Sequence, residues 1–219
     1  MIRYDLHVHT SEVSGCGMVP GARMAELYAQ AGYGGIVITD HFSRYQRFAG
    51  EQDPRRRADA FLAGYRAARR AGEALGLTVL PGLELRFDHG DEDFLVFGVD
   101  EEWIYAHSDA YHLGRKAFHR LAQVDRLLVV QAHPCRPGLR RADHRVIDGV
   151  EVVNRNPRQQ NNNGEALRFA KRYGLLGTGG SDAHQPQDVG RSGILGPAGV
   201  DTPAKLVELL GSGAYEVIR

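Results

Sequence analysis

The chain has 219 residues, of which 42% are hydrophobic and 25% are charged, as in ordinary globular domains and unlike disordered or fibrous chains. Lys plus Arg and Asp plus Glu number 27 each, so the net charge of +0 provides no overall field toward nucleic acid or an acidic membrane. Neither a secretory signal pattern nor an apolar run long enough to span a bilayer occurs. We therefore expect one cytoplasmic domain over residues 1–219. The sequence does not determine its oligomeric state.

Seven short apolar runs rich in Val, Ile and Leu predict strands. In chain order they cover residues 2–8, 35–39, 78–85, 94–99, 127–131, 150–153 and 175–178. Amphipathic patterns between them predict helices around residues 24–31, 58–65, 113–124 and 167–173. Because helices alternate with buried strands, we expect parallel strands joined by right-handed crossovers, in a closed barrel or an open sheet.

Side chains that ligate metals stand at, or just beyond, the C-terminal ends of five predicted strands. They are His7 and His9, Asp40 and His41, Glu84, His133, and Asp182 with His184. In a barrel these strand ends meet at one face, so the side chains would converge. Alternate residues of a strand point to the same side, which would let His7 and His9 chelate one ion. Imidazoles with carboxylates favour zinc, manganese or iron over magnesium or calcium.

Each residue also has a structural interpretation. Asp40 and His41 would form a hydrogen-bonded pair at a helix start, Glu84 would pair with Arg86, and His133 would be an ordinary loop residue. Together these interpretations require many coincidences, because burying polar groups costs several kcal/mol unless they are paired. The joint pattern therefore predicts a metal site.

The motifs DLHVHT, GIVITDH, PGLEL, QAHP and GGSDAH follow one another in this order over nearly the whole chain. In this respect the sequence resembles the PHP family, named for polymerase and histidinol phosphatase domains. The resemblance implies a distorted seven-stranded β/α barrel of TIM-like form, with two or three divalent ions. The ligand sets it implies are His7, His9, Glu84 and Asp182 for one metal, His41 and His184 for a second, and Glu84 with His133 for a third.

Two segments depart from the family pattern. After the H-x-H motif many relatives offer an Asp or His ligand, whereas this chain reads SEVSGCG and leaves Glu12, Ser14 and Cys16 as candidates. In trinuclear relatives a strand histidine completes the third site, where this chain has Asp93 in DFLVFG. Asp93 either replaces that imidazole as a ligand or leaves the third site weak or empty.

The expected reaction is hydrolysis of a phosphate ester. Two metals about 3.5 to 4 Å apart would share a hydroxide and clamp the oxygens of an in-line displacement at phosphorus. Arg136 and Arg191, which follow the His133 and His184 segments, would bind the phosphate. Asp182 or His184 would protonate the leaving group. The expected substrate is a small phosphomonoester such as histidinol phosphate or a nucleotide, and long nucleic acid is disfavoured by the neutral net charge.

Two other functions stay open. Histidine-rich barrel sites also serve amidohydrolases that cleave C–N bonds, although no lysine occupies a recognised bridging position here. Alternatively, the domain would be a metal-stabilised regulatory or binding module associated with a polymerase. Turnover on a panel of phosphate esters separates the second alternative from an enzyme.

Overall fold

The computed structural model describes residues 1–219 and contains eleven strands and six α-helices. The strands are β1 (Ile2–Val8), β2 (Gly35–Ile38), β3 (His41–Phe42), β4 (Thr78–Pro81), β5 (Leu83–Arg86), β6 (Asp93–Phe97), β7 (Leu128–Gln131), β8 (Gly149–Asn154), β9 (Leu176–Gly180), β10 (Gly193–Gly196) and β11 (Glu216–Ile218). The helices are α1 (Gly21–Gln30), α2 (Pro54–Leu75), α3 (Glu101–Ala106), α4 (Arg115–Val124), α5 (Asn163–Tyr173) and α6 (Pro203–Ser212). None of them combines the length and the apolar composition that crossing a membrane requires.

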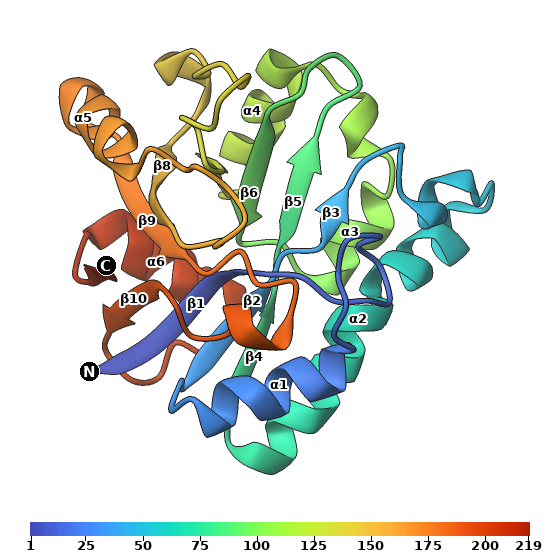
Figure 1. The fold of residues 1–219 in the computed structure, drawn as a ribbon. Coiled ribbons are helices and arrows are strands. Elements are labelled where there is room, and N and C mark those ends of the chain that lie inside the picture. The colour runs from blue at the N-terminus through green and yellow to red at the C-terminus, as the bar shows by residue number, and fades with distance from the viewer.

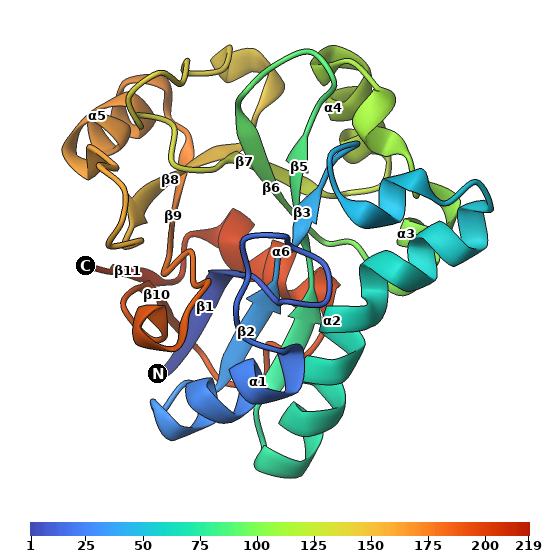
Figure 2. The same cartoon turned by 45° about the vertical axis from the view of Figure 1, so that its right-hand side comes forward.

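The strands form two mixed sheets (Figures 1 and 2). One has the order β11-β10-β1-β2-β4 and the other the order β3-β5-β6-β7-β8-β9. Strand β6 runs antiparallel to β5 and β7, and β10 runs antiparallel to β1 and β11. The predicted α/β class is confirmed, but the predicted closed barrel of seven parallel strands is wrong.

Local chemistry explains two differences from the predicted barrel: the division of one predicted strand and the antiparallel pairing of β5 with β6. The run predicted as one strand over residues 78–85 divides at Gly82, whose backbone is pressed so closely against β2 that an added Cβ would lie 2.8 Å from a methyl carbon of Val37. The chain thereby passes from the first sheet to the second. Only residues 87–92 connect β5 to β6, which is too short for the crossover that a parallel pairing needs.

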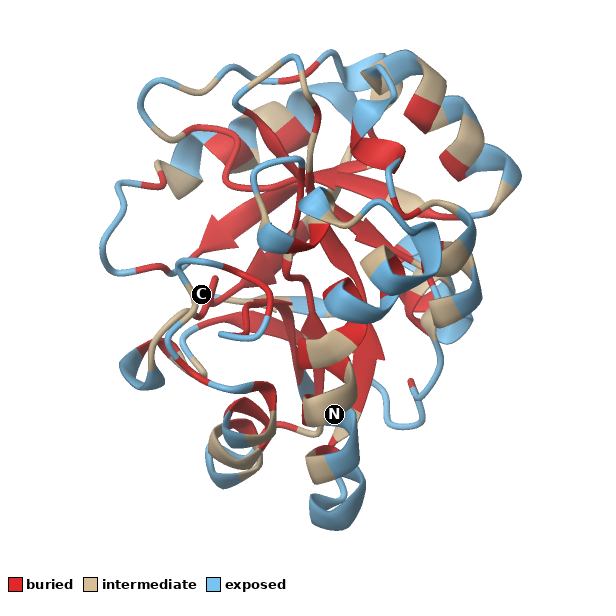
Figure 3. Ribbon diagram, turned by 90° about the vertical axis from the view of Figure 1, so that its right-hand side faces the viewer, coloured by how far each residue is buried: buried red, intermediate tan, exposed pale blue.

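Predicted helices are present at all four places, and their ends follow from capping chemistry. In α2 the Asp53 side chain accepts hydrogen bonds from the amides of Arg55 and Arg56, and Pro54 occupies the first turn. Gly76, with a φ of 67°, ends this helix. The structure adds α3 and α6, which were not predicted. Figure 3 shows buried strands in the interior and helices with exposed outer faces.

The two sheets meet where β1 lies beside the segment that follows β9. The amide of His9 donates to the carbonyl of Ala183 over 3.0 Å, and the amide of Ala183 donates to the carbonyl of His7 over 3.2 Å. Gly180 at the end of β9 permits this approach, because a Cβ there would lie 2.4 Å from the Cβ of His7. This seam brings the H-x-H motif beside the GGSDAH motif.

Candidate metal centre

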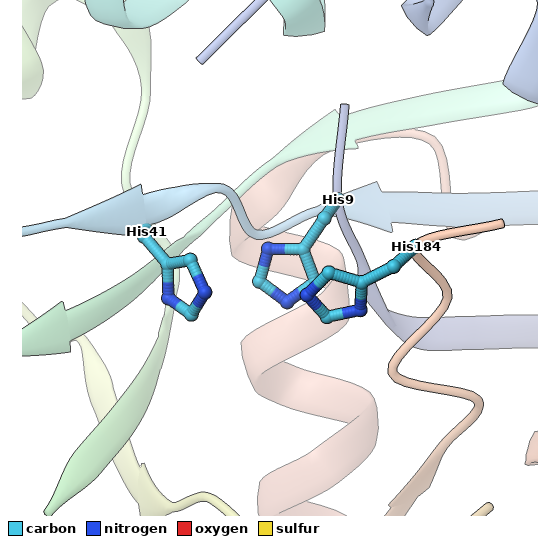
Figure 4. Close-up of side chains that lie close together, drawn as sticks. All are labelled: His9, His41 and His184. Carbon is cyan, nitrogen blue, oxygen red and sulfur yellow. The ribbon is translucent and has the colours of Figure 1, made fainter. Parts of the chain in front are cut away.

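The structure brings together the eight side chains predicted as ligands of the three metal sites, including Asp93, whereas Asp40 belongs to none of the groups and bonds Thr10 and Ser14 instead. The eight side chains form four overlapping groups in which the potential ligand atoms lie within 4.8 Å of one another. The groups are His9, His41 and His184; His7, Glu84 and His133; His7, His9 and Asp182; and His41, Glu84 and Asp93. Figure 4 shows the first of these groups, with three imidazoles, from the residue directly after β1, from β3 and from the segment after β9, turned toward a common space.

Glu84 on β5 lies at the centre of the cluster. Its Oε1 lies 2.9 Å from His133 Nε2 and 3.3 Å from His7 Nε2. Its Oε2 lies 2.7 Å from His41 Nδ1 and 3.4 Å from His9 Nε2. Burial alone would raise the pKa of Glu84, but the charges of His41 and His7 hold that pKa well below its ordinary value. Glu84 is therefore an ionised carboxylate within reach of four imidazoles.

Asp182 closes the cluster from the opposite side. Its Oδ1 lies 3.4 Å from His9 Nε2, 3.5 Å from His7 Nε2 and 3.3 Å from His184 Nδ1. Its Oδ2 accepts a hydrogen bond from Arg136. Burial opposes ionisation, but the charges of His7 and Arg136 hold the pKa of Asp182 well below its ordinary value. Asp182 therefore offers a second permanent negative charge.

Backbone strain accompanies two of these side chains. Asp182 has a φ of 51° and His133 a φ of 30°, in the left-handed region that side-chain-bearing residues rarely adopt. Such conformations cost about 1–3 kcal/mol each and persist where surrounding contacts determine them. Here the bridge between Val8 and Ala183 fixes the first. The hydrogen bond from the His133 amide to Glu151 Oε2, 2.9 Å long, fixes the second.

Unpaired buried atoms test whether these residues fit a metal. The Nε2 atoms of His7 and His9 and the Oε2 atom of Glu84 are buried and have no hydrogen-bond partner. An unpaired buried polar group costs about 1–3 kcal/mol, and here three of them point at one another. A shared divalent cation would satisfy all three, and imidazole with carboxylate is a donor set suited to zinc, manganese or iron. The residues fit a metal centre.

A second layer of side chains orients the imidazoles. His7 Nδ1 lies 3.0 Å from Glu151 Oε1, and His9 Nδ1 lies 3.1 Å from Ser14 Oγ. The Ser14 hydroxyl donates to Asp40 over 2.7 Å. Each contact engages the ring nitrogen that faces away from the cluster, so Nε2 is left free for a metal. Sequence reasoning missed Glu151; its signal was a fully buried acid inside the valine run of β8.

The three candidates in SEVSGCG occupy different places. Glu12 accepts hydrogen bonds of 3.0 Å from the amide of Gly21 at the start of α1, and Ser14 supports His9. Cys16 stands at the rim of the pocket that contains His41 and His184. Partial burial raises the pKa of the Cys16 thiol, but hydrogen bonds with those two imidazoles lower it to about 6. Only Cys16 of the three faces the metal centre.

The Asp93 carboxylate contacts an arginine as well as the histidine cluster. Arg86 holds the Asp93 carboxylate with two hydrogen bonds of 2.7 and 2.6 Å, while His133 Nε2 lies 3.9 Å from Asp93 Oδ2. Burial and the neighbouring charge of Glu84 raise the pKa of Asp93. The alternative pairing of Arg86 with Glu84 is therefore wrong. A third metal held by Asp93 would share that carboxylate with a guanidinium group.

Of the two arginines predicted at the site, one lies at the cluster and the other does not. Arg136 lines a pocket of about 270 Å³ over the cluster and donates to Asn161 Oδ1 over 2.7 Å and to Asn154 Oδ1 over 3.2 Å. Arg191 is exposed, donates to the carbonyl of Gln187 over 2.9 Å and does not line this pocket. The structure does not bring Arg191 to the cluster. Arg158 lines the pocket instead, held by Asp188 at 2.8 and 2.6 Å, and was missed.

Comparison with known proteins gives a family match to part of the chain and a set of related folds. A family model described as PHP-associated matches residues 160–215. A two-domain protein from Bacteroides vulgatus, containing a predicted PHP-like metal-dependent phosphoesterase, is similar with a TM-score of 0.72, 18% identity, and coverage of 99% of this chain and 64% of that one. A search of curated proteins gives no match.

Two further solved structures have the same fold. An amidohydrolase from Chromobacterium violaceum gives a TM-score of 0.56 and 17% identity, covering 95% of this chain and 96% of that one. The lesion-specific endonuclease PfuEndoQ from Pyrococcus furiosus gives 0.62 and 12%, covering 99% of this chain and 57% of that one. This chain thus spans less than two thirds of the Bacteroides and Pyrococcus proteins.

Fold and site together define an α/β protein with a cluster of imidazoles and carboxylates whose donor set fits a metal ion. The resemblance to the PHP family that the motifs indicate is supported by a PHP-associated family model over residues 160–215 only, while the Bacteroides structure, at 18% identity, shows a shared fold.

Removing the Ser14 hydroxyl is expected to weaken metal binding about 10- to 100-fold, because outer-shell partners of a ligating histidine contribute that much. The affinity is measured by competition with a chromophoric chelator. Ser11→Ala, an exposed serine of the same loop, is the matched control and should bind metal like the wild type. Equal affinity of both variants would show that Ser14 does not orient His9.

Proposed function

We propose that the protein is a metal-dependent phosphoesterase that hydrolyses a small phosphate ester, a phosphomonoester such as histidinol phosphate or a nucleotide. The observation that carries the proposal is the Glu84 carboxylate between four imidazoles, beside unpaired Nε2 atoms of His7 and His9. Fold similarity to a predicted phosphoesterase and to an endonuclease supports it.

The proposed ligand sets are based on those that the family resemblance implies, use side chains from the four groups, and would hold two or three ions of zinc, manganese or iron. One ion would be held by His7, His9, Glu84 and Asp182; a second by Glu84, His41 and His184, with Cys16 as a further donor; and a third by Glu84, His133 and Asp93. When bound, such ions polarise phosphoryl oxygens and supply a water nucleophile at neutral pH.

The chain's own residues bind the phosphate and manage protons. Arg136 is held in place by Asn154, Asn161 and Asp182, and its guanidinium is a suitable donor to phosphate oxygens. Of the two predicted acids, Asp182 is held ionised. The pKa of His184 is raised, because hydrogen bonding to Cys16 and the charge of Asp182 outweigh burial. His184 is therefore the better proton donor of the two while its imidazole is free, and water would protonate the leaving group when His184 holds the second ion.

The experiment that tests this function is a substrate panel on protein reconstituted with Mn²⁺ or Zn²⁺. We expect turnover of p-nitrophenyl phosphate that is abolished by a strong chelator and restored by metal. The fold similarity to an amidohydrolase motivates matched p-nitroanilides in the same panel. Faster hydrolysis of the anilides would favour C–N bond cleavage. A fully metal-loaded protein without turnover on either class would favour a regulatory or binding module.

Arg136→Ala is expected to lower kcat/KM for p-nitrophenyl phosphate about 100-fold, because one charge-assisted contact to the phosphate is lost in the transition state. Metal content should stay at the wild-type level, since Arg136 contributes no ligand atom. The matched control is Arg191→Ala, which should keep wild-type activity because Arg191 lies outside the pocket. Reversal of these two results would restore Arg191 as the phosphate-binding residue.

A further inference from the structure

The charge of the chain is unevenly distributed, although it sums to zero. Residues 132–175 contain nine Arg and Lys residues but only four Asp and Glu residues, against 27 of each in the whole chain. This segment comprises the loop before β8, β8 itself, and α5. Figures 1 and 2 both place α5 at the edge of the molecule. The basic charge is therefore local and is hidden in the net value.

Three hollows lie in series between the metal centre and the outer face of α5. The pocket over the metal cluster shares Arg136 with a neighbouring hollow of about 440 Å³, which Arg140 also lines. That hollow shares Arg141 and Glu165 with a third of about 490 Å³. We call the cations along this line the arginine track: Arg136, Arg140, Arg141, Arg168 and Arg172.

Most of the charge on the track is uncompensated. Glu165 is the only acid lining the two outer hollows, and its carboxylate lies 3.8 Å from Arg141. Arg140, Arg168 and Arg172 form no ion pair. Arg168 and Arg172 are also four residues apart on α5, a spacing at which like charges disfavour a helix by a few tenths of a kcal/mol. An anionic ligand would relieve this repulsion.

Aromatic rings accompany the cations. The guanidinium of Arg141 lies 5.7 Å from the ring centre of Phe169, and that of Arg172 lies 5.4 Å from the ring centre of Tyr173. The imidazole of His144 stacks on the ring of Tyr173, with the two ring centroids 4.1 Å apart. Arginines interleaved with aromatic rings are typical of surfaces that bind single-stranded nucleic acid, where phosphates meet cations and bases stack.

We propose that the arginine track binds the backbone of a short oligonucleotide whose terminal phosphate ester reaches the metal centre. This proposal rests on the proposed phosphoesterase function and extends its substrate from a mononucleotide to a strand. Hydrolysis adds water across one P–O bond: the water oxygen bonds to phosphorus, and the leaving oxygen of the strand takes a proton. No oxidant or reductant is needed.

The test uses the double variant Arg168→Glu/Arg172→Glu and a matched control, Lys116→Glu/Arg120→Glu. Both pairs are exposed, four residues apart on one helix, and undergo the same charge change, but the control pair on α4 lies outside the three hollows. Binding of a fluorescein-labelled, 5′-phosphorylated decanucleotide is measured by anisotropy over a range of salt concentrations. Thermal melting of each variant verifies folding.

We expect the α5 variant to bind the decanucleotide at least about tenfold more weakly and with a shallower salt dependence, because phosphate contacts are lost. The α4 control should bind like the wild type, and both should hydrolyse p-nitrophenyl phosphate at the wild-type rate. Equal binding by the two variants overturns the proposal. So does a wild type that binds a mononucleotide or a nucleoside triphosphate as tightly as the decanucleotide.

Failure of the phosphoesterase function would look different. If wild-type protein binds the decanucleotide through α5 but never hydrolyses a phosphate ester with metal present, the track is retained and the proposed activity is rejected. If p-nitrophenyl phosphate is hydrolysed but the strand does not bind, the activity is retained and the track is rejected.

Discussion

Glu84→Gln is expected to lower kcat/KM for a phosphomonoester at least about 10³-fold. The proposed ions share the Glu84 carboxylate as a ligand, and a neutral amide cannot replace it. The glutamine has one acceptor oxygen where the carboxylate has two, and each carboxylate oxygen faces two imidazoles. It also leaves His7 and His41 without their central negative charge. Kinetics on p-nitrophenyl phosphate are measured together with metal content by mass spectrometry.

Glu92→Gln is the matched control for this substitution. Glu92 is also a buried carboxylate beside a cation, with Arg115 Nη2 at 3.1 Å, but it belongs to none of the four ligand groups. The control should retain metal and activity. Wild-type turnover and full metal content in Glu84→Gln would contradict the central role of Glu84.

Metal affinity is expected to fall about 100-fold or more between pH 8 and pH 6, because each proton that a metal must displace changes affinity about tenfold per pH unit. Burial opposes protonation of His7, but the charges of Asp182, Glu151 and Glu84 raise its pKa well above the ordinary value. Glu84 raises the pKa of His41 in the same way. Titration calorimetry in two buffers of different ionisation enthalpy measures the protons released.

The same pKa shifts determine whether the stability of the metal-free protein rises or falls with pH. A raised histidine pKa contributes stability that is fully present below about pH 6.5, the unfolded value, and is lost as the pH rises through the folded pKa. The lowered pKa of Glu84 contributes stability above about pH 4.5 that is lost in acid. The increase in Tm on adding Mn²⁺ should therefore be larger at pH 8 than at pH 6. An increase independent of pH would contradict this assignment of protons.

The convergence of the candidate ligand side chains was predictable because their positions depend on local pattern. Strand periodicity places His7 and His9 on one side, and strand ends carry His41, His133 and Asp182, so convergence required only that the strands share an orientation at one edge. The sequence motifs added the order of these residues and the resemblance to the PHP family. Neither required knowledge of how the two sheets join.

What the sequence did not reveal depends on long-range contacts. Glu151 is an ordinary strand residue until β8 is placed beside His7, 144 positions earlier in the chain. The choice between Arg158 and Arg191 is decided by loop conformation, since Asp188 holds the guanidinium of Arg158 toward the pocket. Barrel closure was mispredicted because strand direction depends on connection length and sheet edges, as at β6 and β10.

The most direct test of the metal centre is anomalous diffraction from crystals soaked in MnCl2, recorded above the manganese absorption edge. We expect a peak bounded by His7 Nε2, His9 Nε2, Glu84 and Asp182, about 2.0–2.3 Å from its ligand atoms, and a second peak beside His41 and His184. Crystals that bind manganese only elsewhere, or that show no peak in this cluster at full soak concentration, would contradict the account.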